Sequence, residues 1–93
     1  MDVISSFKDD ETERIFQGLR SRSFEAIAKT AYRKLAILHP ARTPNDLKSP
    51  GLLREALKDD RAGQHSIRIN DRYRVGFAWR DGEASDVEIV DYH

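Results

Sequence analysis

The 93 residues fit one domain, residues 1–93, and the content of 34% charged and 39% hydrophobic residues is that of a folded, soluble protein. The absence of cysteine excludes disulfides and thiolate metal sites, and no apolar run reaches the roughly 20 residues of a membrane-spanning helix. The formal net charge of zero argues against a nucleic-acid-binding protein. The start of the chain lacks the pattern of a signal peptide, so we expect a cytoplasmic protein with no membrane partner.

The charges are distributed unevenly along the chain. Residues 20–54 carry eight basic and two acidic side chains, a net of +6, whereas residues 81–93 carry five acidic side chains and no Lys or Arg. A neutral total can therefore contain a basic surface beside an acidic one, although ordinary solvated faces produce the same pattern.

The chain begins with the pattern of a short strand and a helix. Residues 3–7 can form an edge strand. Asp9 or Asp10 is a suitable N-cap for a helix over residues 10–19, which Gly18 weakens at its end. Its expected core face contains Ile15, Phe16 and Leu19.

A second helix is expected between a cap at Ser23 and a stop at Pro40. Its apolar residues recur at helical spacing and predict one buried stripe: Phe24, Ile27, Ala28, Ala31, Leu35 and Leu38. Residues 40–51 contain three prolines and a glycine, which predicts a loop that Leu47 attaches to the core.

The second half of the chain predicts antiparallel strands. Asn70-Asp71 and Asp81-Gly82 are suitable two-residue hairpin turns, and such turns require antiparallel pairing. The sequence therefore predicts an α+β fold, with two helices on one face of a small antiparallel sheet. The expected strands cover residues 52–58, 65–69 and 73–79, and a last strand with Val87 and Ile89 on the core face.

Three arginines alternate with the core residues of the central hairpin. If the two strands pair as expected, Arg68, Arg72 and Arg74 project from the same side of the sheet. Clustered guanidinium groups repel one another unless an anion joins them, and phosphate matches their geometry. The alternative is a purely structural role in which a nearby acid pairs with them: Asp71, Glu55 or Glu88.

The chain ends with a carboxylate, a phenol and an imidazole, Asp91-Tyr92-His93, which is either a functional group or a frayed tail. Lys58 lies beside a turn, where an isolated lysine is normally solvated. His39 is expected at the end of the second helix and His65 among packed strand residues. The scattered histidines have no ligand spacing, so no metal site is predicted.

Two stretches resemble a known family. Residues 57–77 read L-K-D-D-R-A-G-Q-H-S-I-R-I-N-D-R-Y-R-V-G-F, similar to the signature L-K-G-x-R-x-G-x-x-S-I-R-I-N-x-x-(W/Y)-R-I-x-F of HigB-type toxins of the RelE/ParE superfamily. Residues 87–93 match the ending V-x-I-x-D-Y-H of that family. The Lys-Leu-Ala-Ile-Leu run at 34–38 also fits, so the resemblance covers nearly the whole chain.

The resemblance implies a RelE-like βααβββ fold and a toxin that cleaves messenger RNA on the 70S ribosome, without a metal or cofactor. It also implies a HigA-like helix-turn-helix antitoxin, through which alone the toxin contacts operator DNA. Exposed apolar residues on the helices, such as Phe16 or Tyr32, are candidates for antitoxin contact, although core positions fit both better.

The resemblance also implies the site residues. The expected catalytic residues are Asp91, Tyr92, His93, Lys58, Arg68 and Arg74. The expected RNA-binding residues are Arg54, Arg61, Arg72 and Lys48. Glu55 occupies the position where some relatives carry an active-site histidine, so it either supplies a base or pairs with an arginine. The competing reading is a non-catalytic nucleic-acid-binding or partner-binding module, which uses the arginines without the tail.

Overall fold

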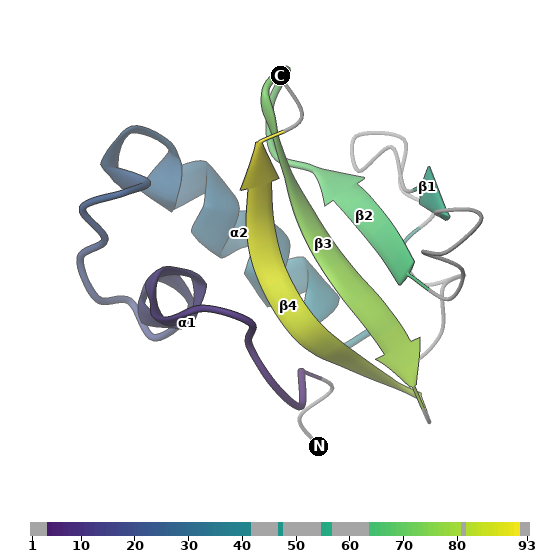
Figure 1. The fold of residues 1–93 in the computed structure, drawn as a ribbon. Coiled ribbons are helices and arrows are strands. Elements are labelled where there is room, and N and C mark those ends of the chain that lie inside the picture. Colours follow the sequence, from purple (N-terminus) through teal and green to yellow (C-terminus); the bar gives the residue numbers. More distant parts are fainter. Residues whose placement is uncertain (1–3, 42–46, 48–54, 57–63, 81, 92–93) are drawn as a thin grey trace.

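The computed structural model describes residues 4–41, 47, 55–56, 64–80 and 82–91 (Figure 1). Several expected site residues lie outside the described residues: Lys48, Arg54, Lys58, Arg61, Tyr92 and His93, and with them the side chain of Glu55. In chain order the elements are α1 (Asp10–Phe16), the 3-10 helix η1 (Glu25–Ile27), α2 (Ala28–Leu38), β1 (Glu55–Ala56), β2 (Gln64–Arg68), β3 (Tyr73–Arg80) and β4 (Glu83–Asp91).

The strands form one antiparallel sheet in the order β1-β2-β3-β4. Both helices lie on the same face, where α1 contacts β4 and α2 contacts β3 (Figure 1). This arrangement confirms the predicted α+β class. The expected strand at 52–58 is described only as the two-residue β1, which pairs with β2.

The core lies between the helices and the sheet, as the alternation predicted. The central strands contribute Ile67, Val75 and Phe77, and β4 contributes Val87 and Ile89, all of them buried. The predicted stripe of the second helix supplies Ala31, Leu35 and Leu38, which are fully buried, and Leu47 is buried with them.

Helix α1 begins as predicted and ends earlier. Asp9 is its N-cap, and the Asp9 carboxylate accepts a hydrogen bond from the backbone N–H of Thr12 at 2.7 Å. Beyond Phe16 the chain turns at Gly18 (φ +79°), and the Leu19 N–H donates to the Arg14 carbonyl at 2.8 Å. This left-handed glycine with a backward hydrogen bond is a Schellman ending. The prediction of a helix to residue 19 was therefore wrong, and Leu19 is 49% exposed instead of buried.

The second helix begins differently from the prediction. Ser23 is not its cap: a 3-10 turn precedes α2, and Phe24 stands at the cap position without a side-chain hydrogen bond. Instead the Ser21 hydroxyl accepts from the Phe24 N–H at 3.3 Å and donates to Glu11 of α1 at 2.7 Å. A contact between the segment that connects the helices and α1 thus replaces the expected local cap. The helix ends before Pro40, with His39 as its C-cap residue, as predicted.

The N-terminal segment lies along β4 without forming a regular strand. Ile4 and Phe7 make isolated parallel bridges to Ala84 and Val87. The bridges are separated because β4 contains a β-bulge between them, where Asp86 has a positive φ of 52°. The expected edge strand at 3–7 is therefore reduced to two bridges on either side of this bulge.

Of the two predicted hairpin turns, one is confirmed. Arg80 pairs with Glu83, and Gly82 has a φ of +77°, so β3 and β4 are joined by a two-residue turn. The turn between β2 and β3 is longer than predicted, because the Ile69 N–H donates to the Tyr73 carbonyl around three residues. Asn70 does not adopt a positive φ, and its side-chain oxygen accepts from the N–H of Tyr73 at 2.8 Å.

Candidate functional site

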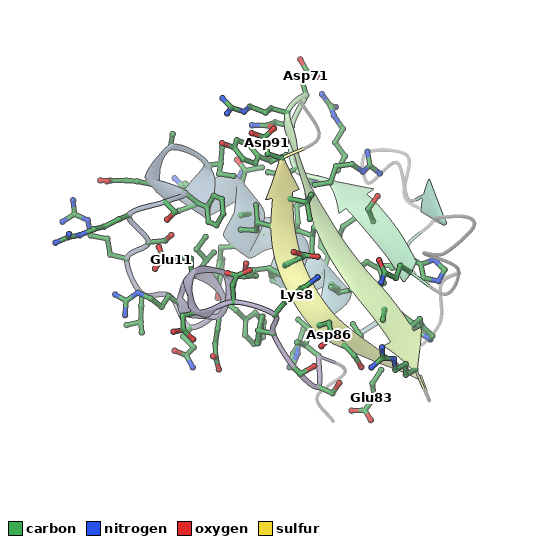
Figure 2. The ribbon with its side chains drawn as sticks, in the orientation of Figure 1. Lys8, Glu11, Asp71, Glu83, Asp86 and Asp91 are labelled. Carbon is green, nitrogen blue, oxygen red and sulfur yellow. The ribbon has the colours of Figure 1, made fainter. Side chains whose placement is uncertain are left out.

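The described site residues gather at one end of the sheet, where the β2–β3 turn and the end of β4 meet. Figure 2 shows Asp71 of the turn and Asp91 of β4 at this end. Arg68 lies directly opposite Arg74 in the β2–β3 register, and Asp91 lies opposite Tyr73 in the β3–β4 register. Pairing across the strands therefore brings Arg68 and Arg74 together on the outer face of the sheet, as the sequence predicted, whereas Asp91 shares the helix-facing side with Tyr73 at the same end of the sheet.

Arg74 is held against the neighbouring strand. Its Nε donates to the Ser66 hydroxyl at 2.7 Å, and its Nη2 donates to the Ser66 carbonyl at 3.4 Å. Ser66 is buried, at 1% exposure, and lies opposite Glu55 of β1. A guanidinium that is fixed to a rigid strand loses less conformational freedom when it binds an anion.

Ser66 is the site residue that the sequence reasoning missed. The signal was present, because Ser66 precedes Arg68 by two residues and therefore shares its face of β2. Its role depends on Arg74 turning back along the sheet, which alternation alone does not show.

Arg68 forms an ion pair with Asp71 of the adjoining turn. The Asp71 side chain is 96% exposed, so water screens this contact and competes for it. One of the structural partners foreseen for the arginines is thus present. The pair is at the surface, where an incoming phosphate can exchange with the carboxylate.

Arg72 takes a different direction from the other two arginines. Its Nε and Nη2 both lie 2.9 Å from Oδ2 of Asp91, and its guanidinium stacks over the Tyr73 ring at 5.2 Å. The hydrogen bond and the charge of Asp91 raise the pKa of Arg72 above its usual value. The expected set of three guanidinium groups is therefore divided into a cross-strand pair and an arginine that holds Asp91.

The two described histidines lie in aromatic contacts away from this end of the hairpin. The His39 ring lies 4.9 Å from the Phe16 ring, and the His65 ring stacks on Phe77 at 5.7 Å. Among the described residues, no three His, Asp or Glu side chains are grouped so as to hold a metal ion. Within the same part of the chain, no helix is long and apolar enough to cross a membrane.

The site can bind a phosphodiester at the arginine pair and holds a carboxylate at the same end of the sheet, on the face of Tyr73. Arg68 and Arg74 supply guanidinium groups of the geometry that phosphate oxygens accept. Asp91, fixed by Arg72, supplies a negative group at the neighbouring strand end. These are the components of a site for acting on a nucleic acid backbone, although other anionic ligands fit the same arginines.

The fold is similar to that of a chain in a solved structure. The YoeB-YefM complex from Staphylococcus aureus contains a similar chain, with a TM-score of 0.61 and 23% sequence identity, covering 97% of this chain and 94% of that one. Likeness at this identity concerns the fold alone.

The sequence comparisons define the family more closely. A family model described as the RelE-like toxin of type II toxin-antitoxin system HigB matches residues 5–93. Toxin HigB-1 of Vibrio cholerae serotype O1 is 36% identical over 81 residues, which are 84% of this chain and 85% of that protein. The chain therefore belongs to the HigB-like toxin family. It is the toxin of a toxin–antitoxin system, and its partner is an antitoxin.

Proposed function

We propose that this toxin is a ribosome-dependent endoribonuclease that cleaves messenger RNA in the cytoplasm and thereby inhibits translation. The observation that carries the proposal is the cross-strand pair of Arg68 and Arg74 at the end of the sheet where β4 brings Asp91. Two guanidinium groups on adjacent strands favour the binding of a phosphodiester. Ribosome dependence is taken from the resemblance to HigB-type toxins, and a substrate oriented by the ribosome reduces what the site itself must supply.

The proposed reaction uses the RNA's own nucleophile. The 2′-oxygen attacks the adjacent phosphorus, the bond from phosphorus to the 5′-oxygen breaks, and the products carry a 2′,3′-cyclic phosphate and a 5′-hydroxyl. A base accepts the proton of the 2′-hydroxyl, and an acid gives a proton to the leaving 5′-oxygen. Cations stabilise the negative charge that develops on the phosphate oxygens.

The residues divide between these roles. We assign charge stabilisation to Arg68, Arg74 and Lys58. Proton transfer is assigned first to His93 and Asp91, because a carboxylate beside an imidazole keeps the pKa of the imidazole in a useful range. Tyr92 either transfers a proton or stacks on an unpaired base. The Arg72 ion pair holds the Asp91 carboxylate at the end of β4.

Further contacts are proposed around the cleavage site. A HigA-like helix-turn-helix antitoxin neutralises the toxin, and the toxin reaches operator DNA only through it. The basic residues that we expect to contact mRNA or ribosomal RNA are Arg54, Arg61, Arg72 and Lys48. Because phosphate contacts release counterions, this binding weakens steeply with salt.

The first test is induced expression of the intact chain and of a chain lacking residues 91–93. Growth and the 5′ ends of cellular mRNA are measured together. We expect growth arrest and new mRNA ends from the intact chain only. Equal arrest from both chains moves the active site away from the tail, and arrest without new ends returns the protein to the binding-module class.

A second test uses two arginines of the same strand. Arg74→Gln removes one of the paired guanidinium groups, and Arg80→Gln is the matched control at the other end of β3, where Arg80 lies 3.6 Å from Asp86. Removal of one donor to a developing oxyanion typically lowers a rate about 100-fold or more. We expect a loss of that order in ribosome-bound mRNA cleavage for Arg74→Gln and little change for Arg80→Gln. Equal activities would remove the arginine pair from the mechanism.

A further inference from the structure

The ion pair between Arg68 and Asp71 joins two side chains of very different exposure. The Arg68 side chain is 37% exposed, whereas the Asp71 side chain is 96% exposed at the tip of the β2–β3 hairpin (Figure 2). In the ion pair between Arg80 and Asp86 the partners are more alike, with 65% and 51% of their side chains exposed. The Asp71 carboxylate can therefore leave its arginine for water and lose almost no buried contact.

The turn that carries Asp71 is built from other polar groups. The Asn70 side-chain oxygen accepts hydrogen bonds from the N–H groups of Arg72 and Tyr73, at 2.9 and 2.8 Å. The N–H groups of Ile69 and Asn70 both donate to the Tyr73 carbonyl, at 2.9 and 3.2 Å. None of these hydrogen bonds uses the Asp71 carboxylate, so the turn holds the carboxylate in place and keeps its shape without it.

Arg68 and Arg74 lie opposite each other but are held in different ways. Arg74 donates to the hydroxyl and the carbonyl of the buried Ser66. Arg68 is bound to the charged Asp71. A carboxylate oxygen accepts from a guanidinium as a phosphate oxygen does, so Asp71 takes a position at Arg68 that a phosphodiester oxygen would otherwise take. Two negative groups at one guanidinium also repel each other.

We propose that Asp71 is an internal competitor of the substrate, a carboxylate that occupies the phosphate-binding side of Arg68 in the free toxin and is displaced when RNA binds. The carboxylate thereby weakens the binding of loose single-stranded RNA. It competes with any phosphodiester, because a phosphate group carries no information about base sequence. The proposal rests on the proposed function, in which Arg68 binds a phosphodiester of RNA.

The experiment measures the binding of the purified full-length toxin to a short single-stranded RNA. The RNA carries methylated 2′-hydroxyl groups, so the nucleophile of the proposed reaction is blocked and the strand is not cleaved. Fluorescence anisotropy gives the dissociation constant for the wild type and for Asp71→Asn. We expect Asp71→Asn to bind about two- to fivefold more tightly, the range of an exposed ion pair. A gain of affinity cannot come from a damaged fold, which would lower it.

Two variants serve as controls. Asp86→Asn removes the same unit of charge, and asparagine tolerates the positive φ of the bulge. From Tyr73 to Ala78, which pairs beside the bulge, β3 spans about 16 Å. Because the Debye length is about 10 Å at 0.1 M salt, Asp86→Asn should change the RNA affinity by less than about 1.5-fold under that condition. Asp71→Glu keeps the charge at the tip of the hairpin and should bind RNA as the wild type does.

The contact with Arg68 is tested by combining variants. Arg68→Gln should bind RNA more weakly than the wild type, and the addition of Asp71→Asn should give no gain, because the partner of the competitor is absent. A gain that persists in the Arg68→Gln background overturns the proposal, since the carboxylate then repels RNA without occupying Arg68. Equal gains for Asp71→Asn and Asp86→Asn overturn it as well.

The remaining outcomes separate this proposal from the proposed function. Undiminished RNA binding by Arg68→Gln overturns the phosphate-binding role of Arg68, and this proposal with it. Weaker binding by Arg68→Gln, together with an unchanged affinity of Asp71→Asn, overturns the competitor alone and leaves the phosphate-binding role in place. Thermal melting of each variant verifies that the fold is retained.

Discussion

Replacement of Thr12 by valine tests the connection between helix α1 and the strand that carries Asp91. Thr12 is fully buried. Its hydroxyl accepts a hydrogen bond from the Ile89 N–H at 3.1 Å and donates to the Asp9 carboxylate at 3.1 Å. Valine keeps the shape of the side chain and removes both hydrogen bonds, so the change isolates the polar contribution.

The expected loss of stability is substantial for so small a change. The Ile89 N–H would remain buried without an acceptor, which costs about 1–3 kcal/mol. The cap itself survives, because the Asp9 carboxylate still accepts from the backbone N–H of residue 12. At an unfolding entropy of about 2.1 cal/mol/K per residue, the free energy of unfolding of the 93 residues falls by about 0.2 kcal/mol per degree near the melting temperature. The melting temperature should therefore fall by roughly 5–15 °C.

Thermal unfolding followed by circular dichroism measures this fall, and hydrogen exchange of the Ile89 amide measures its cause. Thr12→Ser is the control, since serine keeps the hydroxyl and loses only a buried methyl group. We expect fast exchange at Ile89 in the valine variant and protection in the serine variant. A valine variant as stable as the wild type, with its Ile89 amide still protected, would refute the reasoning.

Two further predictions concern charged groups at the surface. The hydrogen bonds from the Ser21 hydroxyl and the Ser23 N–H lower the pKa of Glu11 below its ordinary value of 4.5. The stability from these bonds is complete above pH 4.5 and is lost as the pH falls through the lowered pKa. Urea unfolding should therefore show Glu11→Gln less stable than the wild type at pH 7, with a smaller difference at pH 3. Arg72→Gln removes an exposed ion pair with Asp91, so its melting temperature should fall less than that of Thr12→Val, and a larger fall would show that this pair stabilises the end of β4.

The sheet and its core were predictable because they depend on short-range patterns. Alternation placed Ile67 and Val75 on one face, and the register pairs them directly. Gly82 marked the position of the β3–β4 turn, because this turn requires a residue with a positive φ. Where one face of a strand is buried, the alternation of apolar and polar residues shows which face it is.

The helix boundaries were less predictable, because contacts between distant residues determine them. Ser23 had the composition of a cap, yet the Phe24 N–H donates to the Ser21 hydroxyl, which is held by Glu11, ten residues earlier. The early end of α1 follows from the left-handed Gly18, whose presence alone is compatible with a longer, weakened helix. That early end leaves Leu19 exposed.

The candidate site depends on one feature that the sequence does not reveal, the bulge at Asp86. Before the bulge Ala78 pairs with Ser85, and after it Gly76 pairs with Glu88, so β4 contains one extra residue. Without that residue the later half of β4 would slip by one position, and its side chains would exchange faces.

The bulge therefore serves the core and the site together. It allows both Ala84 and Val87 to face the core, although they are three residues apart and strict alternation would have placed them on opposite faces. It also pairs Tyr73 with Asp91, and this register brings the Asp91 carboxylate to Arg72. Asp86 adopts the required positive φ, which Asp tolerates better than most residues, and its N–H donates to the Ser6 hydroxyl at 2.9 Å. The position of the strand end that carries the candidate catalytic carboxylate is thus set five residues earlier, by an irregularity that the N-terminal segment stabilises.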